Sequence, residues 1–247
     1  MTARHLPGSS NTRVAEVRKG SNVVLKQEDN PIVWIDCEMT GLDLANDGIV
    51  EVSVVITGSD LVPVDEGIDL VIKPTPEALA SMGAFVTKMH TDSGLIKEWE
   101  TGLDLKDAEE QVLAYISARV PKGKAPLGGN SVGTDKSFLE RDMPSVIDYL
   151  HYRVIDVSTI KELARRWYPR AYFAAPEKFG NHRALGDIYD SIDELRYYRS
   201  VLFPQGDGPT TDQAKERSAE ILASRTQLSF DTAGSDETTT AEGTEQA

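Results

Sequence analysis

Two acidic residues stand two positions apart directly after an apolar run. Asp36 and Glu38 follow Ile-Val-Trp-Ile at residues 32–35, a run typical of a strand that is buried on both faces. Residues two apart in a strand project from the same face, so the two carboxylates are expected to point together. A divalent cation would relieve both their mutual repulsion and the cost of burying their charge. A pair of solvent-facing acids at a strand end is the alternative, and these two residues alone do not separate the two interpretations.

Two further polar clusters lie where the chain is expected to enter a helix. Residues 128–135 read Gly-Gly-Asn-Ser-Val-Gly-Thr-Asp, which places Asp135 in the first turn of the following helix. Residues 182–187 read His-Arg-Ala-Leu-Gly-Asp, which places His182 just before a helix and Asp187 in its first turns. An acid near a helix N-terminus is favoured by the helix dipole, so each cluster alone also fits a structural role. Because imidazole accepts a proton near neutral pH, His182 is also a candidate general base.

The secondary-structure elements expected around these clusters are strands in the first part of the chain and helices alternating with strands after it. Strand-forming residues fill residues 49–57 and 68–73, and the short links between the first three strands favour antiparallel neighbours. Apolar residues then recur at helical spacing over residues 105–120. The remaining expected elements are strands at residues 125–129 and 153–157, and helices from about residue 134 and over residues 159–167 and 184–202. Strands followed by alternating helices and strands predict a single α/β domain with a mixed sheet flanked by helices.

Composition changes near both ends of the chain. Residues 1–29 show no sustained period and are predicted to form a flexible N-terminal extension. Residues 30–204 hold the predicted domain, whose apolar content is sufficient for a core. Residues 205–247 are acidic and are predicted to be a mostly disordered tail, in which residues 212–224 could form a short, weakly amphipathic helix.

The overall charge and the single cysteine narrow the class of protein. A net charge of −14 argues against a nonspecific binder of long nucleic acid, because such binding neutralises many phosphates with Lys and Arg. It does not exclude an enzyme whose carboxylates hold divalent cations. No apolar run approaches the ~20 residues that cross a bilayer, so no membrane association is expected. The only cysteine, Cys37, should point to the face opposite Asp36 as a small buried side chain, and its lack of a partner fits the cytoplasm.

Taken together, the polar clusters resemble the DEDDh exonucleases, which have a ribonuclease H-like fold. The order Asp-x-Glu, then Asp, then His-x-x-x-x-Asp is the pattern of that family. The resemblance implies that Asp36, Glu38, Asp135 and Asp187 bind two divalent cations, and that His182 is the general base. Carboxylate oxygens suit Mg²⁺ or Mn²⁺, and a pair of such ions stabilises both oxygens of a phosphodiester displacement.

Two longer runs resemble the oligoribonuclease family in particular. They are Asp-Cys-Glu-Met-Thr-Gly-Leu-Asp at residues 36–43 and the segment at residues 151–167, within a similarity that extends over residues 31–203. By that resemblance, Leu42 would lie beside a terminal base, and Tyr152 would lie near the scissile phosphate across a homodimer interface. The residues implied to hold the 5′ phosphate of a dinucleotide are Ser131, Arg153 and Ser158.

Two positions depart from the pattern of the family. Gly186 precedes Asp187 at a position where relatives often place an acid. Phe85 stands five residues before His90, where relatives can place a tryptophan. A phenylalanine ring can still stack on a base, so Phe85 is predicted to bind substrate. His90 itself receives no role.

The expected activity is 3′-to-5′ hydrolysis of short oligoribonucleotides and dinucleotides to nucleoside 5′-monophosphates, by a cytoplasmic homodimer. A DEDDh DNA exonuclease of the proofreading type is one alternative, although it would not require the segment at residues 152–167. A catalytically silent RNA-binding module on the same fold is another, and the intact acids and His182 argue against it.

Overall fold

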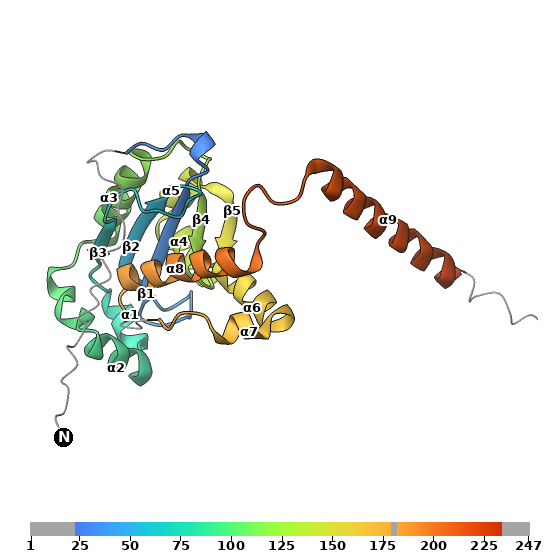
Figure 1. Cartoon of the computed structure of the whole chain (residues 1–247). Helices are drawn as coiled ribbons and strands as arrows, with labels where there is room; N and C mark the ends of the chain where they lie inside the picture. Colours follow the sequence, from blue (N-terminus) through green and yellow to red (C-terminus); the bar gives the residue numbers. More distant parts are fainter. Residues whose placement is uncertain (1–22, 179–181, 234–247) are drawn as a thin grey trace, which may run out of the picture. The chain divides into compact units, whose positions relative to one another are not determined.

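The computed structural model describes residues 23–178 and 182–233 (Figure 1). They belong to two units, the first ending at Val201 and the second beginning at Leu202. Among these residues, no helix combines the length and apolar character that a membrane span requires.

The first unit is built on a mixed five-stranded sheet with the order β3-β2-β1-β4-β5. Its strands are β1 (Ile32–Met39), β2 (Ile49–Thr57), β3 (Ile68–Val71), β4 (Pro126–Gly129) and β5 (His151–Asp156). Strands β1, β2 and β3 pair antiparallel, as predicted, whereas β4 runs parallel to both β1 and β5. The predicted α/β domain with a mixed, helix-flanked sheet is confirmed, and β1 is its central strand.

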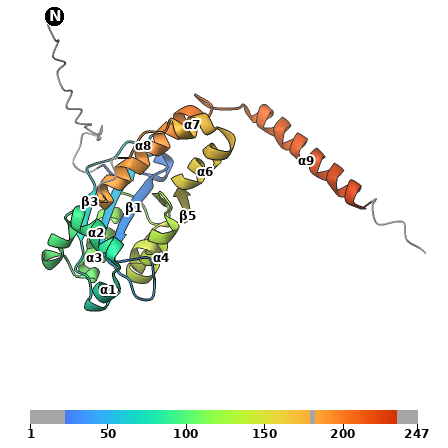
Figure 2. The same ribbon diagram turned by 90° about the horizontal axis from the view of Figure 1, so that it is seen from below.

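Helices cover both faces of this sheet (Figure 2). The longer ones are α2 (Ala84–Asp92), α3 (Leu105–Ser117), α4 (Gly133–Asp142), α6 (Val157–Trp167) and α8 (Ala184–Leu202). The shorter ones are α1 (Pro76–Ser81), α5 (Pro144–Tyr149), α7 (Pro169–Phe173), and the 3-10 helices η1 (Gln27–Asp29), η2 (Leu95–Lys97) and η3 (Trp99–Thr101). The predicted helix at residues 184–202 coincides with α8.

Strand β1 divides its side chains between two environments. Val33, Ile35 and Cys37 belong to the main hydrophobic core, which α3, α4 and α5 complete, so the predicted burial of Cys37 is confirmed. Trp34 points to the other face, where its indole N–H donates to Thr57 Oγ1 at 3.0 Å. The period-2 alternation of the strand therefore presents the acidic residues of β1 to the face that α8 crosses (Figure 1).

The segment between β3 and β4 contains helices that the sequence did not predict. Helix α2 lies there and carries both Phe85 and His90. Its one buried residue is His90, so the helix lacks the apolar stripe from which an amphipathic helix is recognised.

The first unit starts earlier than the predicted boundary at residue 30. Leu25 is only 2% exposed and belongs to the main core, and its N–H donates to the carbonyl of Arg119 at 2.8 Å. The carbonyl of Asp29 accepts from the N–H of Ser59 at 3.0 Å. Residues 23–29 are thus tied down by contacts that are distant in sequence, whereas residues 1–22 of the predicted extension lie outside the described part of the chain.

The second unit contains a long helix, α9 (Thr211–Ala233), which includes the short helix that the sequence allows at residues 212–224 and extends beyond it. Thr210 and Gln213 form reciprocal capping bonds between side chain and backbone, at 2.9 and 3.3 Å. Arg217 and Glu220 pair one turn apart at 2.7 Å. Local capping and pairing therefore support a helix whose side chains are exposed as far as residue 225. The rest of the predicted tail, residues 234–247, is not among the described residues.

Gly128 of β4 leaves room for the side chains of Ile32 and Trp34 on the neighbouring strand β1. A Cβ at this position would lie 2.7 Å from Ile32 Cγ2 and 3.1 Å from Trp34 Cε3. Gly128→Ala should therefore lower the free energy of unfolding by about 1–3 kcal/mol, the cost of overpacking a core. Urea unfolding followed by circular dichroism measures this change.

Gly133→Ala is the matched control, because a Cβ there meets nothing within 4 Å and the residue begins α4. Its stability should stay the same or rise slightly. Equal stability of the two variants would show that the close approach at Gly128 is unimportant.

Candidate active site

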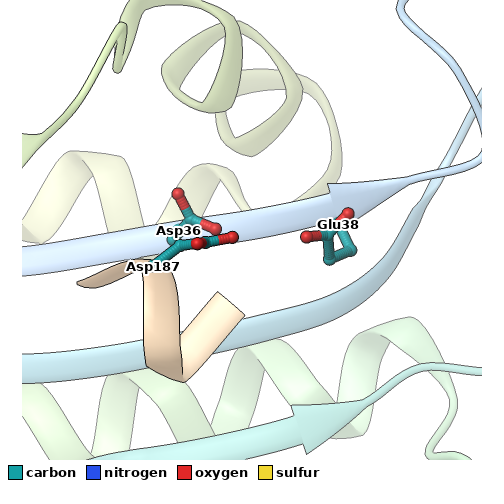
Figure 3. A group of neighbouring side chains, drawn as sticks. All are labelled: Asp36, Glu38 and Asp187. Carbon is teal, nitrogen blue, oxygen red and sulfur yellow. The ribbon is translucent and has the colours of Figure 1, made fainter. Parts of the chain in front are cut away.

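Three carboxylates from two elements converge on the sheet face that α8 crosses (Figure 3). Asp36 and Glu38 come from β1, and Asp187 comes from the first turn of α8. One carboxylate oxygen from each lies within 4.8 Å of the others. The structure therefore brings together three of the four acids that the sequence singled out.

The fourth acid, Asp135, lies beside this group rather than within it. It stands in the first turn of α4 and is only 8% exposed. Its Oδ1 accepts the backbone N–H of Cys37, the residue between Asp36 and Glu38, at 3.0 Å. Burial raises the pKa of Asp135 to about 6, although that hydrogen bond acts in the opposite direction.

The three grouped carboxylates are held where ionisation is costly. Burial, reinforced by the charges of Asp135 and Asp187, raises the pKa of Asp36 well above its usual range. Burial and the charge of Asp187 raise the pKa of Glu38 to about 8. Burial also raises the pKa of Asp187.

These acids have the character of a divalent cation site. Within residues 23–178 and 182–225, no lysine or arginine forms an ion pair with any of the three. Closely spaced carboxylate oxygens, here one buried and two half-buried, without a cationic partner are a donor set that Mg²⁺ and Mn²⁺ favour. The residues present therefore fit a divalent metal.

His182 lies at the entrance to α8 with an unusual backbone conformation. Its φ of 51° is in the left-handed region, which is uncommon for a residue with a side chain and is enriched at functional positions. Its side chain is exposed, and its charge acts on Asp187 in the direction that favours the ionised carboxylate. The predicted base and a predicted metal ligand are thus electrostatic neighbours.

A cavity of about 550 Å³ opens beside His182. Phe85, which is 80% exposed, lines it together with Lys88 and Met89 of α2. The structure therefore places the predicted base and the predicted stacking residue around one cavity, although they are far apart in the sequence.

The start of α8 is anchored by a buried acid that sequence reasoning missed. Glu51 of β2 is fully buried and accepts from Arg183 Nε at 2.6 Å and from the N–H of Ala184 at 3.0 Å. Arg183 also donates to Glu98 at 2.9 Å. Because Glu51 is paired with Glu38 across the β1–β2 ladder, this anchor fixes the His182 segment directly beside the carboxylates. The feature that could have identified Glu51 is its position, because it is an acidic residue within a strand rich in β-branched residues.

His90, to which the sequence gave no role, is buried behind Glu38. Its Nε2 lies 2.9 Å from the carbonyl of Met39 and must donate, so its Nδ1 carries no proton in the neutral ring. That Nδ1 lies 3.9 Å from Glu38 Oε2 and has no hydrogen-bond partner among the described residues. Burial lowers the pKa of His90, so the ring is a neutral neighbour of Glu38.

Two of the three residues predicted to hold a 5′ phosphate meet at the ends of β4 and β5. The Ser131 N–H donates to Asp156 Oδ1 at 3.0 Å and to Ser158 Oγ at 2.6 Å. The hydroxyls of Ser131 and Ser158 are 2.9 Å apart. Asn130, a residue that the prediction did not use, accepts from Ser158 Oγ at 3.3 Å and donates to Glu194 of α8 at 3.0 Å.

The third predicted phosphate-binding residue lies on the edge strand β5. Arg153 and its neighbour Tyr152 are both exposed, and the guanidinium carbon lies 5.5 Å from the tyrosine ring centre. Tyr152 is 77% exposed. Neither side chain is packed into the hydrophobic core of this chain.

Leu42 is presented by a rigid loop after β1. It is 76% exposed, whereas the nearby Asp47 is buried. Asp47 accepts from the N–H of Asp43 at 2.9 Å and from the hydroxyl of Thr40 at 3.1 Å. A Cβ on Gly41 would collide with the Asp47 carboxylate, so a larger residue there would have to displace Asp47 from these hydrogen bonds.

Known proteins are similar to this chain in both sequence and fold. Residues 33–195 match the RNase_T family of exonucleases. An oligoribonuclease from Streptomyces griseus is 58% identical over 193 residues, which cover 78% of this chain and 96% of the relative. An oligoribonuclease from Streptomyces coelicolor is 57% identical over 194 residues, which cover 78% of this chain and 97% of the relative.

The fold also matches a solved structure of E. coli exonuclease I in complex with a dA16 oligonucleotide. The TM-score is 0.57 with 13% identity, over 70% of this chain. The match spans about two fifths (41%) of that exonuclease, and at this identity it shows the fold alone. Identity above one half over nearly the whole length of the two Streptomyces relatives is the decisive finding. This chain belongs to the oligoribonuclease family of exonucleases.

Proposed function

We propose that this chain is a metal-dependent 3′-to-5′ exoribonuclease that degrades short oligoribonucleotides and dinucleotides to nucleoside 5′-monophosphates. The observation that carries the proposal is the group formed by Asp36, Glu38 and Asp187, whose oxygens lie within 4.8 Å of one another. The names of the two Streptomyces relatives support an RNA substrate of short length.

The carboxylates would hold two divalent cations, Mg²⁺ or Mn²⁺. Asp36, Glu38 and Asp187 would bind one of them, and Asp36 with Asp135, directly or through water, would bind the other. Bound cations of this kind stabilise the charge that develops on the attacking and leaving oxygens of a phosphodiester. The electrostatics of the site support the assignment. Desolvation and mutual repulsion raise the free energy of the ionised carboxylates, and a bound cation would lower it.

His182 would act as the general base that takes a proton from the attacking water. Its position beside Asp187 and at the edge of the Phe85 cavity supports this role. The Glu51–Arg183 contact would hold it in place, because Arg183 is the next residue in the chain. General bases act best when their position is fixed before the substrate binds.

The remaining predicted residues would bind the two ends of the substrate. Leu42 and Phe85, both strongly exposed, would flank the 3′-terminal base. Arg153 and the paired hydroxyls of Ser131 and Ser158 would hold the 5′ phosphate, since a guanidinium and hydroxyl donors suit a phosphate. A site that binds both ends selects short RNA.

We also propose a homodimer in which Tyr152 reaches the scissile phosphate of the partner subunit. Strand β5 is an edge of the sheet, and its exposed side chains include Tyr152 and Val154. Trp167 and Phe173, which follow on α6 and α7, are also more than 60% exposed. Exposed aromatics beside an unpaired strand edge are typical of a subunit interface. The cytoplasm is the proposed compartment, since the one cysteine is buried and unpaired.

Asp36→Asn tests the metal site and the activity together. The variant should release no mononucleotides from labelled RNAs of two to twenty residues, whereas the wild type should clear the shortest ones first. Its affinity for Mn²⁺, measured by calorimetry, should fall, while its melting temperature without metal should stay the same or rise because a repulsive charge is removed.

Asp107→Asn, which neutralises an exposed acid of α3, is the control and should behave as the wild type. Near-normal turnover by folded Asp36→Asn protein would refute the metal assignment.

His182→Ala tests the general base. Turnover should fall by ~100-fold or more, because proton transfer by a positioned base contributes at least that much. Mn²⁺ affinity should persist, since the carboxylates remain. Wild-type activity should also fall on acidification, because a protonated imidazole cannot accept the proton. An unchanged rate at neutral pH would exclude the role.

Arg153→Ala tests the 5′-phosphate contact. Wild-type protein should bind a 5′-phosphorylated dinucleotide more tightly than either its unphosphorylated form or a ten-residue RNA. Losing one charge-assisted contact should reduce that preference by about tenfold. Arg165→Ala is the control, because Arg165 pairs with Glu162 on the exposed side of α6. Equal wild-type affinity for all three RNAs would leave only a general exonuclease.

A further inference from the structure

Glu194 of α8 is a buried acid that contacts two lysines, and its single negative charge can neutralise only one of them. It is 5% exposed, yet it lies 3.1 Å from the Lys161 ammonium and 3.4 Å from the Lys178 ammonium. Asn130 also donates to it at 3.0 Å. One carboxylate balances one ammonium, so this group carries a net positive charge within a chain of net charge −14.

This positive group lies between the two halves of the proposed substrate site. Asp187, Ser191 and Glu194 are four and three residues apart, so they share one face of α8. The Ser191 hydroxyl donates to the Asp187 carbonyl at 2.8 Å and lies 3.0 Å from Asn130 Nδ2. Asn130 in turn accepts from Ser158, which belongs to the proposed 5′-phosphate contact. Hydrogen bonds thus connect the Asp187 backbone, through Ser191 and Asn130, to Ser158. Asn130 also bonds to Glu194, which contacts the two lysines.

The two lysines come from different parts of the chain. Lys161 comes from α6 and makes the shorter contact with Glu194. Lys178 stands four residues before His182 and contacts Glu194, which shares one face of α8 with Asp187. Lys178 therefore lies against the helix face that also carries one of the predicted metal ligands. An ammonium has three donors, and contact with one carboxylate oxygen does not exhaust them.

We propose that Lys178 binds the phosphate that links the two nucleotides of the substrate, with Glu194 holding the lysine in place. This inference rests on the proposed function. The linking phosphate would lie at Asp36, Glu38 and Asp187 while the 5′ phosphate would lie at Ser131 and Ser158. Lys178 contacts Glu194, which shares a helix face with Asp187 and is linked through Asn130 to Ser158. A compact ammonium is suited to such a phosphate as a point charge. The alternative is that Lys178 serves only as an ion-pair partner of Glu194.

Lys178→Met and Lys161→Met are a matched pair, because both lysines contact the same carboxylate and both side chains are 39% exposed. Affinities are measured by calorimetry with Mn²⁺ for two 5′-phosphorylated diribonucleotides. One has a phosphorothioate linkage, which keeps the negative charge and resists hydrolysis. The other has a methylphosphonate linkage, which is neutral.

Lys178→Met should weaken binding of the phosphorothioate ligand by about tenfold and of the methylphosphonate ligand by less than about twofold. Lys161→Met should change neither by more than about twofold. The slope of log affinity against log salt concentration should also shrink by about 0.7 for Lys178→Met with the charged ligand, as one phosphate contact is lost.

Equal losses from the two lysine variants, or equal losses for the two ligands, would overturn the proposal in favour of the ion-pair role. Lys178→Gln, which keeps polarity without charge, should repeat the result of Lys178→Met if that variant is unstable. Failure of the wild type to release mononucleotides from a diribonucleotide would instead overturn the proposed function. Normal wild-type release together with unchanged binding by Lys178→Met would overturn the lysine inference alone.

Discussion

The repulsion among Asp36, Glu38 and Asp187 is the constraint on which the rest of the structure depends. Their oxygens lie within 4.8 Å of one another, Glu38 is buried and the other two are half-buried, and the pKa values of all three are raised, chiefly by desolvation. Left to itself, such a group would move apart or take up protons. The fold must therefore hold it by other means, and it does so by placing two members on the central strand of the sheet.

The third member comes from a helix more than a hundred residues later, so its position depends on a separate anchor. Glu51 supplies that anchor by accepting both the Arg183 side chain and the Ala184 backbone. Buried ion pairs of this kind contribute little net stability but fix one arrangement over others. The same contact constrains His182, whose left-handed backbone would be costly in a free loop.

Positive charge is concentrated where the proposed function needs it, although the chain as a whole is acidic. Glu194 contacts both Lys161 and Lys178 on the helix that also carries Asp187, and Arg153 is exposed on the edge strand. A long RNA would pass beyond these few cations and meet a chain of net charge −14. Short substrates, which carry few phosphates, suit this charge distribution.

The sequence by itself determined which face of β1 carries the acidic pair and much of the fold, because these follow from local periodicity. The alternation of β1 placed Asp36 and Glu38 on one face, and apolar spacing located α8. Only the tertiary structure decided that Asp135 bonds to the backbone beside the group, and that α2 exists at all. It also decided that Glu51 anchors α8 and that Glu194 unites two lysines. These features arise from contacts between residues remote in sequence, and buried polar partners leave no periodic signal by which one sequence could reveal them.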